Sequence, residues 1–198
     1  MNAPAPLYGL VLTGGRSRRF GRDKAAFEIA GETLLQRTVE LLAPLVAELR
    51  VSVRPDQVSE SHRAAYPLLV DQLADGPGAG LLAAHAHAPA AAWLVLACDL
   101  PRLNAELLLQ LIEARDPGRA ATAFRSPVNG RPEPLCAIYE PATLAAFRRQ
   151  VDAGAKASPR DLLEAADVAL IDAQQPSALT NMNRPADLSN TKTEGFAR

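Results

Sequence analysis

The chain has 198 residues, of which 48% are hydrophobic, and its 21 basic and 22 acidic residues give a formal net charge of −1. This length fits one domain, and a nearly neutral chain has no global attraction for nucleic acid or an anionic membrane, so we expect neither as a partner. No apolar run reaches the roughly 20 residues of a membrane span and no secretion signal stands out, so we expect a cytoplasmic protein.

Short β-type runs recur along the chain. The runs at residues 8–12 and 93–97 are apolar almost throughout, which is typical of central strands in a sheet covered on both faces. Residues 1–6 and 191–198 are expected to be loose tails. The other predicted strands lie at residues 49–53, 68–70, 135–139 and 168–171.

Helical segments lie between these runs. Thr33 and Gln36 have the spacing of a capping box, and Pro44 should end or kink the helix that begins there. Strands that alternate with helices indicate a single α/β domain with a mainly parallel sheet. The other predicted helices cover residues 78–88, begin after Asn104, cover residues 141–151 and begin at Ser158 and Pro159.

The most informative segment follows the first strand, where residues 12–24 read Leu-Thr-Gly-Gly-Arg-Ser-Arg-Arg-Phe-Gly-Arg-Asp-Lys. Ligands of open α/β sheets bind beyond the carboxyl ends of the strands. The adjacent Gly14 and Gly15 let the backbone turn sharply and approach a ligand, and successive N–H groups can cradle an anion. Four arginines and one lysine lie within residues 16–24, a density of positive charge that suits a triphosphate.

Two familiar phosphate-binding motifs are absent from this segment. A P-loop has four residues between its glycines and then Gly-Lys-Ser/Thr, whereas five residues separate Gly15 from Gly21 and Lys24 follows only later. The dinucleotide fingerprint Gly-x-Gly-x-x-Gly is excluded because Gly14 and Gly15 are adjacent. The alternative interpretation is a solvated basic loop or a nucleic-acid patch.

Carboxylates follow two of the predicted strands. Asp99 comes at the end of the run that begins at Trp93, and Pro101 then stops the strand; Asp71 follows an apolar run in the same way. Mg²⁺ prefers oxygen ligands, so two carboxylates at neighbouring strand ends can hold a magnesium ion that binds phosphates. Each could instead be an ordinary turn residue or helix cap. Residues 76–80 form a second glycine-rich turn, which either approaches a ligand or simply precedes a helix.

The remaining reactive side chains indicate no other chemistry. His62 lies in a polar segment, and His85 and His87 are two apart on a predicted helix and do not share a face. Cys98 and Cys136 lie in apolar segments, which favours buried, reduced thiols over a disulfide or metal site.

Together these motifs resemble the molybdenum cofactor guanylyltransferase family within the nucleotidyltransferase superfamily. Residues 12–24 are similar to the family signature Leu-Ala-Gly-Gly-x-Ser-x-Arg-Met-Gly-x-Asp-Lys, from which Thr13 and Phe20 depart. The resemblance covers almost the whole chain. Its other matching segments are Asp71 and residues 76–80, 98–101, 131–139 and 181–188.

The resemblance implies a three-layer α/β/α, Rossmann-like nucleotidyltransferase fold with a mainly parallel sheet. Within one domain, we expect residues 7–100 to form a nucleotide-binding half and residues 101–190 an acceptor-binding half. The implied reaction converts GTP and the molybdopterin cofactor to the guanine dinucleotide cofactor and pyrophosphate, with Mg²⁺ as cofactor. Molybdoenzymes or their chaperones would receive the product, and we expect a monomer or weak oligomer.

The resemblance also assigns roles to individual residues. Lys24, Asp99 and Arg19 are expected to be catalytic, and Asp99 to be the Mg²⁺ ligand. Ser52 stands where the family often has Asn, so it offers a nucleotide fewer hydrogen-bond donors. Asn181 and Asn183 are expected on the acceptor side. The expected nucleotide-binding residues are Leu12, Thr13, Gly14, Gly15, Arg16, Lys24, Ser52, Asp71, Gly80 and Asp99.

Three alternatives stay open. A sister family transfers CMP to the same acceptor, but its loop typically reads Leu-Ala-Ala-Gly and closes on Pro-Lys, whereas Gly14-Gly15 and Asp23-Lys24 resemble the guanylyl form. Another superfamily member could transfer a nucleotide to a sugar phosphate. A third possibility is a regulatory protein that binds nucleotide without catalysis.

Overall fold

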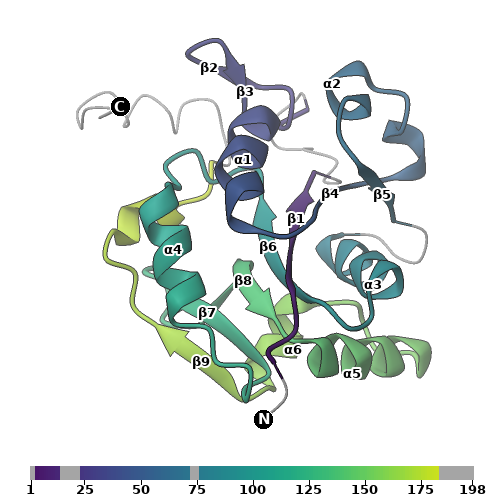
Figure 1. Cartoon of the computed structure of the whole chain (residues 1–198), viewed down its shortest axis with the longest axis vertical. Coiled ribbons are helices and arrows are strands. Elements are labelled where there is room, and N and C mark those ends of the chain that lie inside the picture. The colour runs from purple at the N-terminus through teal and green to yellow at the C-terminus, as the bar shows by residue number, and fades with distance from the viewer. Residues whose placement is uncertain (1–2, 14–22, 72–75, 183–198) are drawn as a thin grey trace.

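The computed structural model describes residues 3–13, 23–71 and 76–182. The fold is built on a seven-stranded sheet (Figure 1). In spatial order the strands are β5 (Leu68–Val70), β4 (Leu49–Val53), β1 (Leu7–Leu12), β6 (Ala92–Ala97), β8 (Pro132–Tyr139), β7 (Ala121–Arg125) and β9 (Val168–Ile171).

The strand directions divide the sheet into two parts. Neighbours among β5, β4, β1 and β6 all run parallel. β8 is antiparallel to both β6 and β7, and β9 runs parallel to β7. The predicted α/β class with a mainly parallel sheet is therefore confirmed, although β7 was not predicted and β8 is longer than the predicted run at 135–139.

The central strands are apolar throughout because both faces of the sheet are covered. Leu10 and Val11 are each fully buried yet belong to different core clusters, since consecutive strand residues point to opposite faces. Trp93 and Leu94 divide in the same way on β6. A strand buried on both faces needs a nearly continuous apolar run, and β1 and β6 have one.

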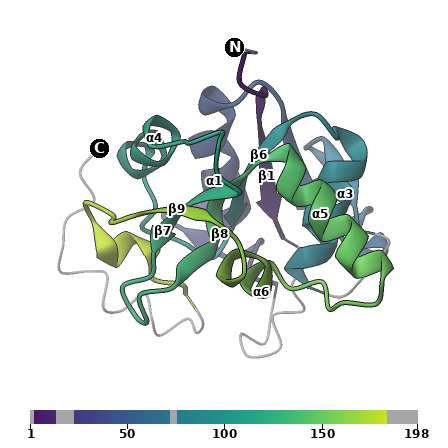
Figure 2. The ribbon, with the colours of Figure 1, turned by 90° about the horizontal axis from the view of Figure 1, so that it is seen from below.

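Helices cover the two faces and complete the three layers (Figure 2). α1 (Leu34–Leu42) and α4 (Ala105–Glu113) pack their leucines into one core cluster. The other cluster takes its helical residues from α3 (Pro77–His87), α5 (Pro141–Asp152) and α6 (Pro159–Glu164). The predicted three-layer α/β/α arrangement is confirmed.

Three of the predicted helix starts are stabilised by side-chain caps, which accept hydrogen bonds from otherwise unpaired backbone N–H groups. Thr33 Oγ1 accepts from the N–H of Gln36 at 3.0 Å. Asn104 Oδ1 accepts from Leu107 N–H at 3.0 Å, and Ser158 Oγ accepts from the backbone N–H three residues on at 3.2 Å. The chain leaves α1 through a 3₁₀ turn at Ala43–Leu45, so Pro44 does end the helix.

The smaller elements were not predicted. β2 (Glu28–Ile29) and β3 (Glu32–Thr33) form a hairpin whose turn residues, Ala30 and Gly31, both have positive φ. A short helix α2 (Ser61–Ala64) lies between β4 and β5, and 3₁₀ turns occur at Pro55–Gln57 and Pro176–Leu179. None of the helices described is long and apolar enough to cross a membrane.

Candidate functional site

The carboxyl ends of the four parallel strands bring the predicted site residues to one edge of the sheet. β1 ends at Leu12, with Thr13 next, and β4 carries Ser52 beside it. Asp71 directly follows β5, and Asp99 lies two residues beyond β6. In the sheet, β4 and β5 lie on one side of β1, and β6 lies on its other side. Ligands of open α/β sheets bind at such a reversal of strand order, beyond the carboxyl ends of the strands.

Lys24 and Asp99 form an ion pair at this edge. Lys24 Nζ lies 2.9 Å from Asp99 Oδ2, and the two side chains are only 17% and 22% exposed. The other carboxylate oxygen, Oδ1, is buried and has no hydrogen-bond partner among the residues described. A buried acceptor without a donor carries a free-energy cost, so this oxygen is suited to a cation.

The segment around Asn181 joins the same place. The backbone N–H of Met182 donates to the carbonyl oxygen of Asp99 at 2.8 Å, and Met182 is buried against Leu34. Asn181 Oδ1 is likewise buried and finds no hydrogen-bond donor within the described part of the chain. The structure therefore brings a predicted acceptor-side residue next to the predicted catalytic carboxylate.

Ser52 and Asp71 form a buried pair. The Ser52 hydroxyl lies 2.7 and 2.9 Å from the two oxygens of Asp71 and donates to that carboxylate. Ser52 is fully buried and Asp71 is 8% exposed. Thr13 Oγ1 donates to the Ser52 carbonyl at 2.7 Å, so three of the predicted nucleotide-binding residues form one connected group. The Ser52 hydroxyl is directed to Asp71 in this arrangement.

Burial changes the protonation of Asp71. Loss of solvent raises the pKa of its carboxyl from 3.8 to about 6, against the opposing effects of the Ser52 hydrogen bond and the positive charge of Arg54. A carboxylate kept at this cost next to a strand end is a functional-site candidate on physical grounds.

Glycines let helix α3 approach the strand ends closely. Gly76 has φ of +91°, a conformation that favours glycine. A Cβ on Gly80 would lie 2.5 Å from Leu12 Cδ2 and 2.6 Å from Ser52 Oγ. A side chain there would force Leu12 or Ser52 to move, so Gly80 packs directly on two other predicted nucleotide-binding residues.

Glu133 was not assigned a role from the sequence, although it lies in a matching segment. β8 begins at Pro132 and runs antiparallel to β6, so Glu133 lies toward the end of β6 that Asp99 follows. Burial raises the pKa of Glu133, and the negative charge of Asp99 adds to the increase. The antiparallel direction of β8, which the sequence did not reveal, was the missing information.

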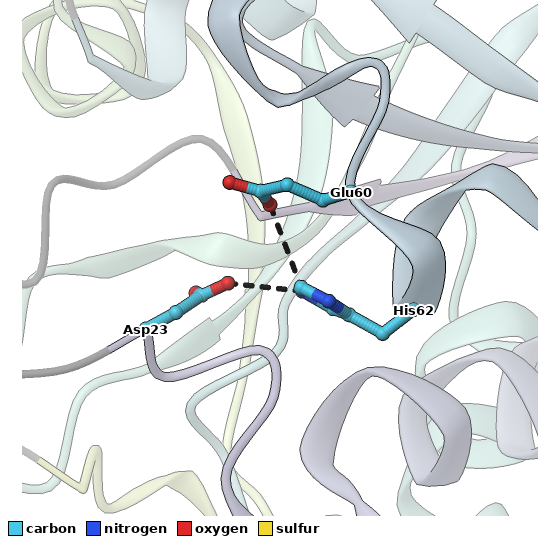
Figure 3. A group of neighbouring side chains, drawn as sticks. All are labelled: Asp23, Glu60 and His62. Carbon is cyan, nitrogen blue, oxygen red and sulfur yellow. Dashed lines mark hydrogen bonds and ion pairs between the residues drawn. The ribbon is translucent and has the colours of Figure 1, made fainter.

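A second cluster that the sequence did not reveal lies beside Thr13. Asp23, Glu60 and His62 converge (Figure 3), with His62 Nε2 at 3.0 Å from Asp23 Oδ2. These residue types could hold a metal ion, but the Nη1 atom of Arg63 contacts all three of them. The guanidinium is therefore the cation at the centre of this cluster.

The structure describes only part of the predicted site. It brings together Leu12, Thr13, Lys24, Ser52, Asp71, Gly80, Asp99 and Asn181. The predicted roles of Gly14, Gly15, Arg16, Arg19 and Asn183 concern positions outside the described residues.

Comparison with known proteins places the chain in context. Residues 9–173 match the family described as MobA-like NTP transferase domain. The chain is 37% identical over 194 residues to the "Probable molybdenum cofactor guanylyltransferase" of Opitutus terrae, covering 94% of each protein. It is also 37% identical over 183 residues to the "Molybdenum cofactor biosynthesis bifunctional protein" of Synechocystis sp., of which it spans 52%.

A solved structure shows the same fold. The molybdopterin-guanine dinucleotide biosynthesis protein A from Archaeoglobus fulgidus superimposes with a TM-score of 0.76 at 25% identity. The superposition covers 93% of this chain and 96% of that one.

Proposed function

Because this chain belongs to the family of MobA-like NTP transferase domains, we propose that it transfers GMP from GTP to the molybdenum-molybdopterin cofactor. The products are the guanine dinucleotide cofactor and pyrophosphate. The observation that carries this proposal is the ion pair of Lys24 and Asp99. The backbone carbonyl of Asp99 also accepts a hydrogen bond from Met182, the residue that follows Asn181. Asp99 thus contacts both the positive charge of Lys24, which suits a triphosphate, and the segment that we assign to the acceptor.

On the nucleotide side, the connected group of Thr13, Ser52 and Asp71 forms the floor of the proposed site. Ser52 holds the Asp71 carboxylate in place, and Asp71 then accepts hydrogen bonds from the nucleotide. Gly80 keeps helix α3 close to this floor, because it packs directly on Leu12 and Ser52. Gly14 and Gly15 supply the backbone N–H groups toward guanine and phosphates, and the missing Cβ at Gly14 favours the larger purine over cytosine.

The residues present fit a magnesium ion. Asp99 Oδ1 is a buried carboxylate oxygen without a donor among the described residues, and hard divalent cations prefer such oxygen ligands. We propose that Asp99 holds Mg²⁺, which when bound neutralises phosphate charge. Lys24 remains on the second oxygen of the same carboxylate and fixes its orientation.

The reaction needs no general base. The acceptor is a phosphate monoester with a second pKa near 6, so it is largely dianionic at neutral pH. One of its oxygens forms a bond to the α-phosphorus of GTP, and the bond from that phosphorus to the bridging oxygen of pyrophosphate breaks. The chain positions the reactants and neutralises the developing charge through Lys24 and the arginines of residues 16–22. We place the reaction in the cytoplasm, where GTP is available.

The decisive experiment supplies the purified protein with molybdopterin cofactor, Mg²⁺ and either GTP or CTP, and measures dinucleotide product by mass. Product with GTP alone supports the proposal. Product with CTP alone would keep the mechanism but replace guanine with cytosine. Tight nucleotide binding without pyrophosphate release would instead indicate a binding protein.

A further inference from the structure

We propose that Arg63 is a positioning residue for nucleotide transfer. Its guanidinium holds Thr13 and Asp23, and through Asp23 it sets Lys24 against Asp99. Thr13 and Asp23 are the described residues on either side of residues 14–22. This inference rests on the proposed function, because it names the residue that positions Thr13 and Lys24, which the proposed function assigns to the nucleotide.

Every N–H donor of the Arg63 guanidinium has an acceptor on a neighbouring residue. An arginine side chain has five N–H donors in a rigid fork. Nε donates to Thr13 Oγ1 at 3.1 Å, and Nη2 donates to the Thr13 carbonyl at 3.2 Å and to Asp23 Oδ1 at 3.0 Å. Nη1 donates to Asp23 Oδ2 at 2.5 Å and to Glu60. Nη1 also contacts His62 Nε2, so each of the five donors has at least one partner, and Asp23 is held in two-point geometry.

Because Arg63 is buried, its guanidinium must keep these hydrogen-bond partners. The side chain of Arg63 is fully buried, and a buried charge is tolerated only when it is paired and hydrogen-bonded. The two carboxylates of Asp23 and Glu60 compensate its charge, so Arg63 has little left for attracting phosphate. Burial alone would raise the pKa of Asp23, but the hydrogen bonds and positive charge of Arg63 hold it below its usual value. The role of Arg63 is therefore geometric.

The contacts of Asp23 carry this geometry to the catalytic pair. Asp23 Oδ1 also accepts from Ala25 N–H at 3.1 Å, which fixes the turn that contains Lys24. Lys24 in turn reaches Asp99 at 2.9 Å. On the other side, Thr13 Oγ1 accepts from Arg63 while donating to the Ser52 carbonyl. Arg63 thus couples the Lys24–Asp99 pair to the group of Thr13, Ser52 and Asp71.

Substitution Arg63→Lys keeps the charge but replaces the fork with one ammonium that has three donors. Three donors on one nitrogen cannot serve the five acceptors that the guanidinium serves on Thr13, Asp23 and Glu60. The KM for GTP should rise by about tenfold or more, because small misplacements at a reacting centre are costly. The KM for the acceptor should change much less.

Arg115→Lys is the matched control. Arg115 also forms a largely buried two-point pair, with Glu140 at 2.7 and 3.0 Å. Glu140 follows β8 at the edge opposite the site, since β8 runs antiparallel to β6. Loss of this pair should lower the melting temperature without changing GTP binding.

A second readout needs no nucleotide. Acetylation of Lys24 by a limiting amine-reactive reagent, mapped by mass spectrometry against exposed Lys156, reports how firmly Lys24 is held. Labelling should be several times faster in Arg63→Lys than in the wild-type protein, and unchanged in Arg115→Lys. If the wild-type protein bound no nucleotide, the proposed function would fail, and the labelling would still decide the role of Arg63. Unchanged Lys24 labelling in a folded Arg63→Lys variant, or equal GTP losses in both variants, would overturn the inference.

Discussion

Asp99 uses its two carboxylate oxygens differently. Oδ2 takes the ammonium of Lys24, whereas Oδ1 is buried without a donor in the described chain. One oxygen is thus fixed by the protein and the other is left for a ligand. This division gives the carboxylate a fixed orientation before any substrate arrives.

Substitution Lys24→Ala should therefore abolish transfer without unfolding the protein. The pair is only 17% and 22% exposed, so its loss should cost more than the roughly 1 kcal/mol of an exposed pair and less than the roughly 3–5 kcal/mol of a fully buried one. The ammonium of Lys24 would stabilise the negative charge that develops on the phosphates during transfer. Its removal should lower the transfer rate roughly 100-fold or more. Pyrophosphate release and a thermal melt measure the two effects, with exposed Lys156→Ala as control. Normal turnover in Lys24→Ala would remove Lys24 from the mechanism.

Asp71 should make stability depend on pH. Because its folded pKa is raised from 3.8 to about 6, the folded chain binds this proton more tightly than the unfolded chain. The stabilisation is complete below about pH 4 and is lost as the pH rises through about 6. The difference of about two pKa units corresponds to about 3 kcal/mol.

Asp71→Asn removes this titration while keeping an oxygen to accept from Ser52. The variant should be more stable than the wild-type protein above pH 7, by up to about 3 kcal/mol, and the difference should vanish near pH 4. Urea unfolding at several pH values measures it. A stability difference that does not vary with pH would show that Asp71 is not destabilised by burial. Nucleotide affinity of the variant should fall.

At the scale of elements, helix α3 is held close to its neighbours by two glycines. A Cβ on Gly78 would lie 2.1 Å from the backbone oxygen of Ala157, and one on Gly80 would meet Leu12 and Ser52. A backbone oxygen cannot move aside as the end of a side chain can. The position of the helix over the strand ends therefore depends on the absence of these two methyl groups.

Gly78→Ala and Gly80→Ala should each lower the free energy of unfolding by about 1–3 kcal/mol, because overpacking outweighs the gain in helix propensity. Gly80→Ala should also weaken nucleotide binding, since it displaces Ser52 and with it Asp71. Gly118→Ala is the control, because its Cβ would meet only a side-chain oxygen of Asp116 at 3.2 Å. Chemical denaturation compares the three. Wild-type stability in Gly78→Ala would contradict the close packing.

The same scale shows what the sequence can predict. The periodicity of apolar residues and the capping residues Thr33, Asn104 and Ser158 placed the main helices correctly. Strand β7 was missed because Ala121 and Ala123 occupy one of its two buried faces, and alanine gives little strand signal.

Arg63 was missed for a different reason. A lone arginine in a polar segment is usually exposed, and its partner Asp23 lies 40 residues away in the chain. Ser52 and Asp71 were both predicted as site residues, yet their hydrogen bond depends on β4 and β5 being neighbours. Contacts between distant segments are set by topology, which local patterns do not encode.

For the whole molecule, one sheet unites the two proposed halves. β6 pairs with β1 from the nucleotide side and with β8 from the acceptor side, so a single hydrogen-bond ladder crosses the boundary. Trp93, the only tryptophan, is fully buried on β6 at this boundary. We propose that residues 7–100 and 101–190 are functional halves of one cooperative unit.

Unfolding should accordingly follow one transition. Trp93 fluorescence and far-ultraviolet circular dichroism should give coincident curves. Mg²⁺ and GTP at about 100 times the dissociation constant should stabilise the protein by about 2.7 kcal/mol. Two separate transitions, or a shift confined to one of the two signals, would show that the halves unfold independently.

The bond from Met182 to the carbonyl of Asp99 also has a consequence for biosynthesis. Translation delivers β1, β4, β5 and β6 first, and β8 and residues 176–182 only afterwards. A nascent chain that has emerged through β6 has its nucleotide-side strands, yet one edge of β6 is unpaired and Asp99 has no partner for its carbonyl. The order of synthesis therefore leaves an apolar strand edge that must be shielded until β8 arrives.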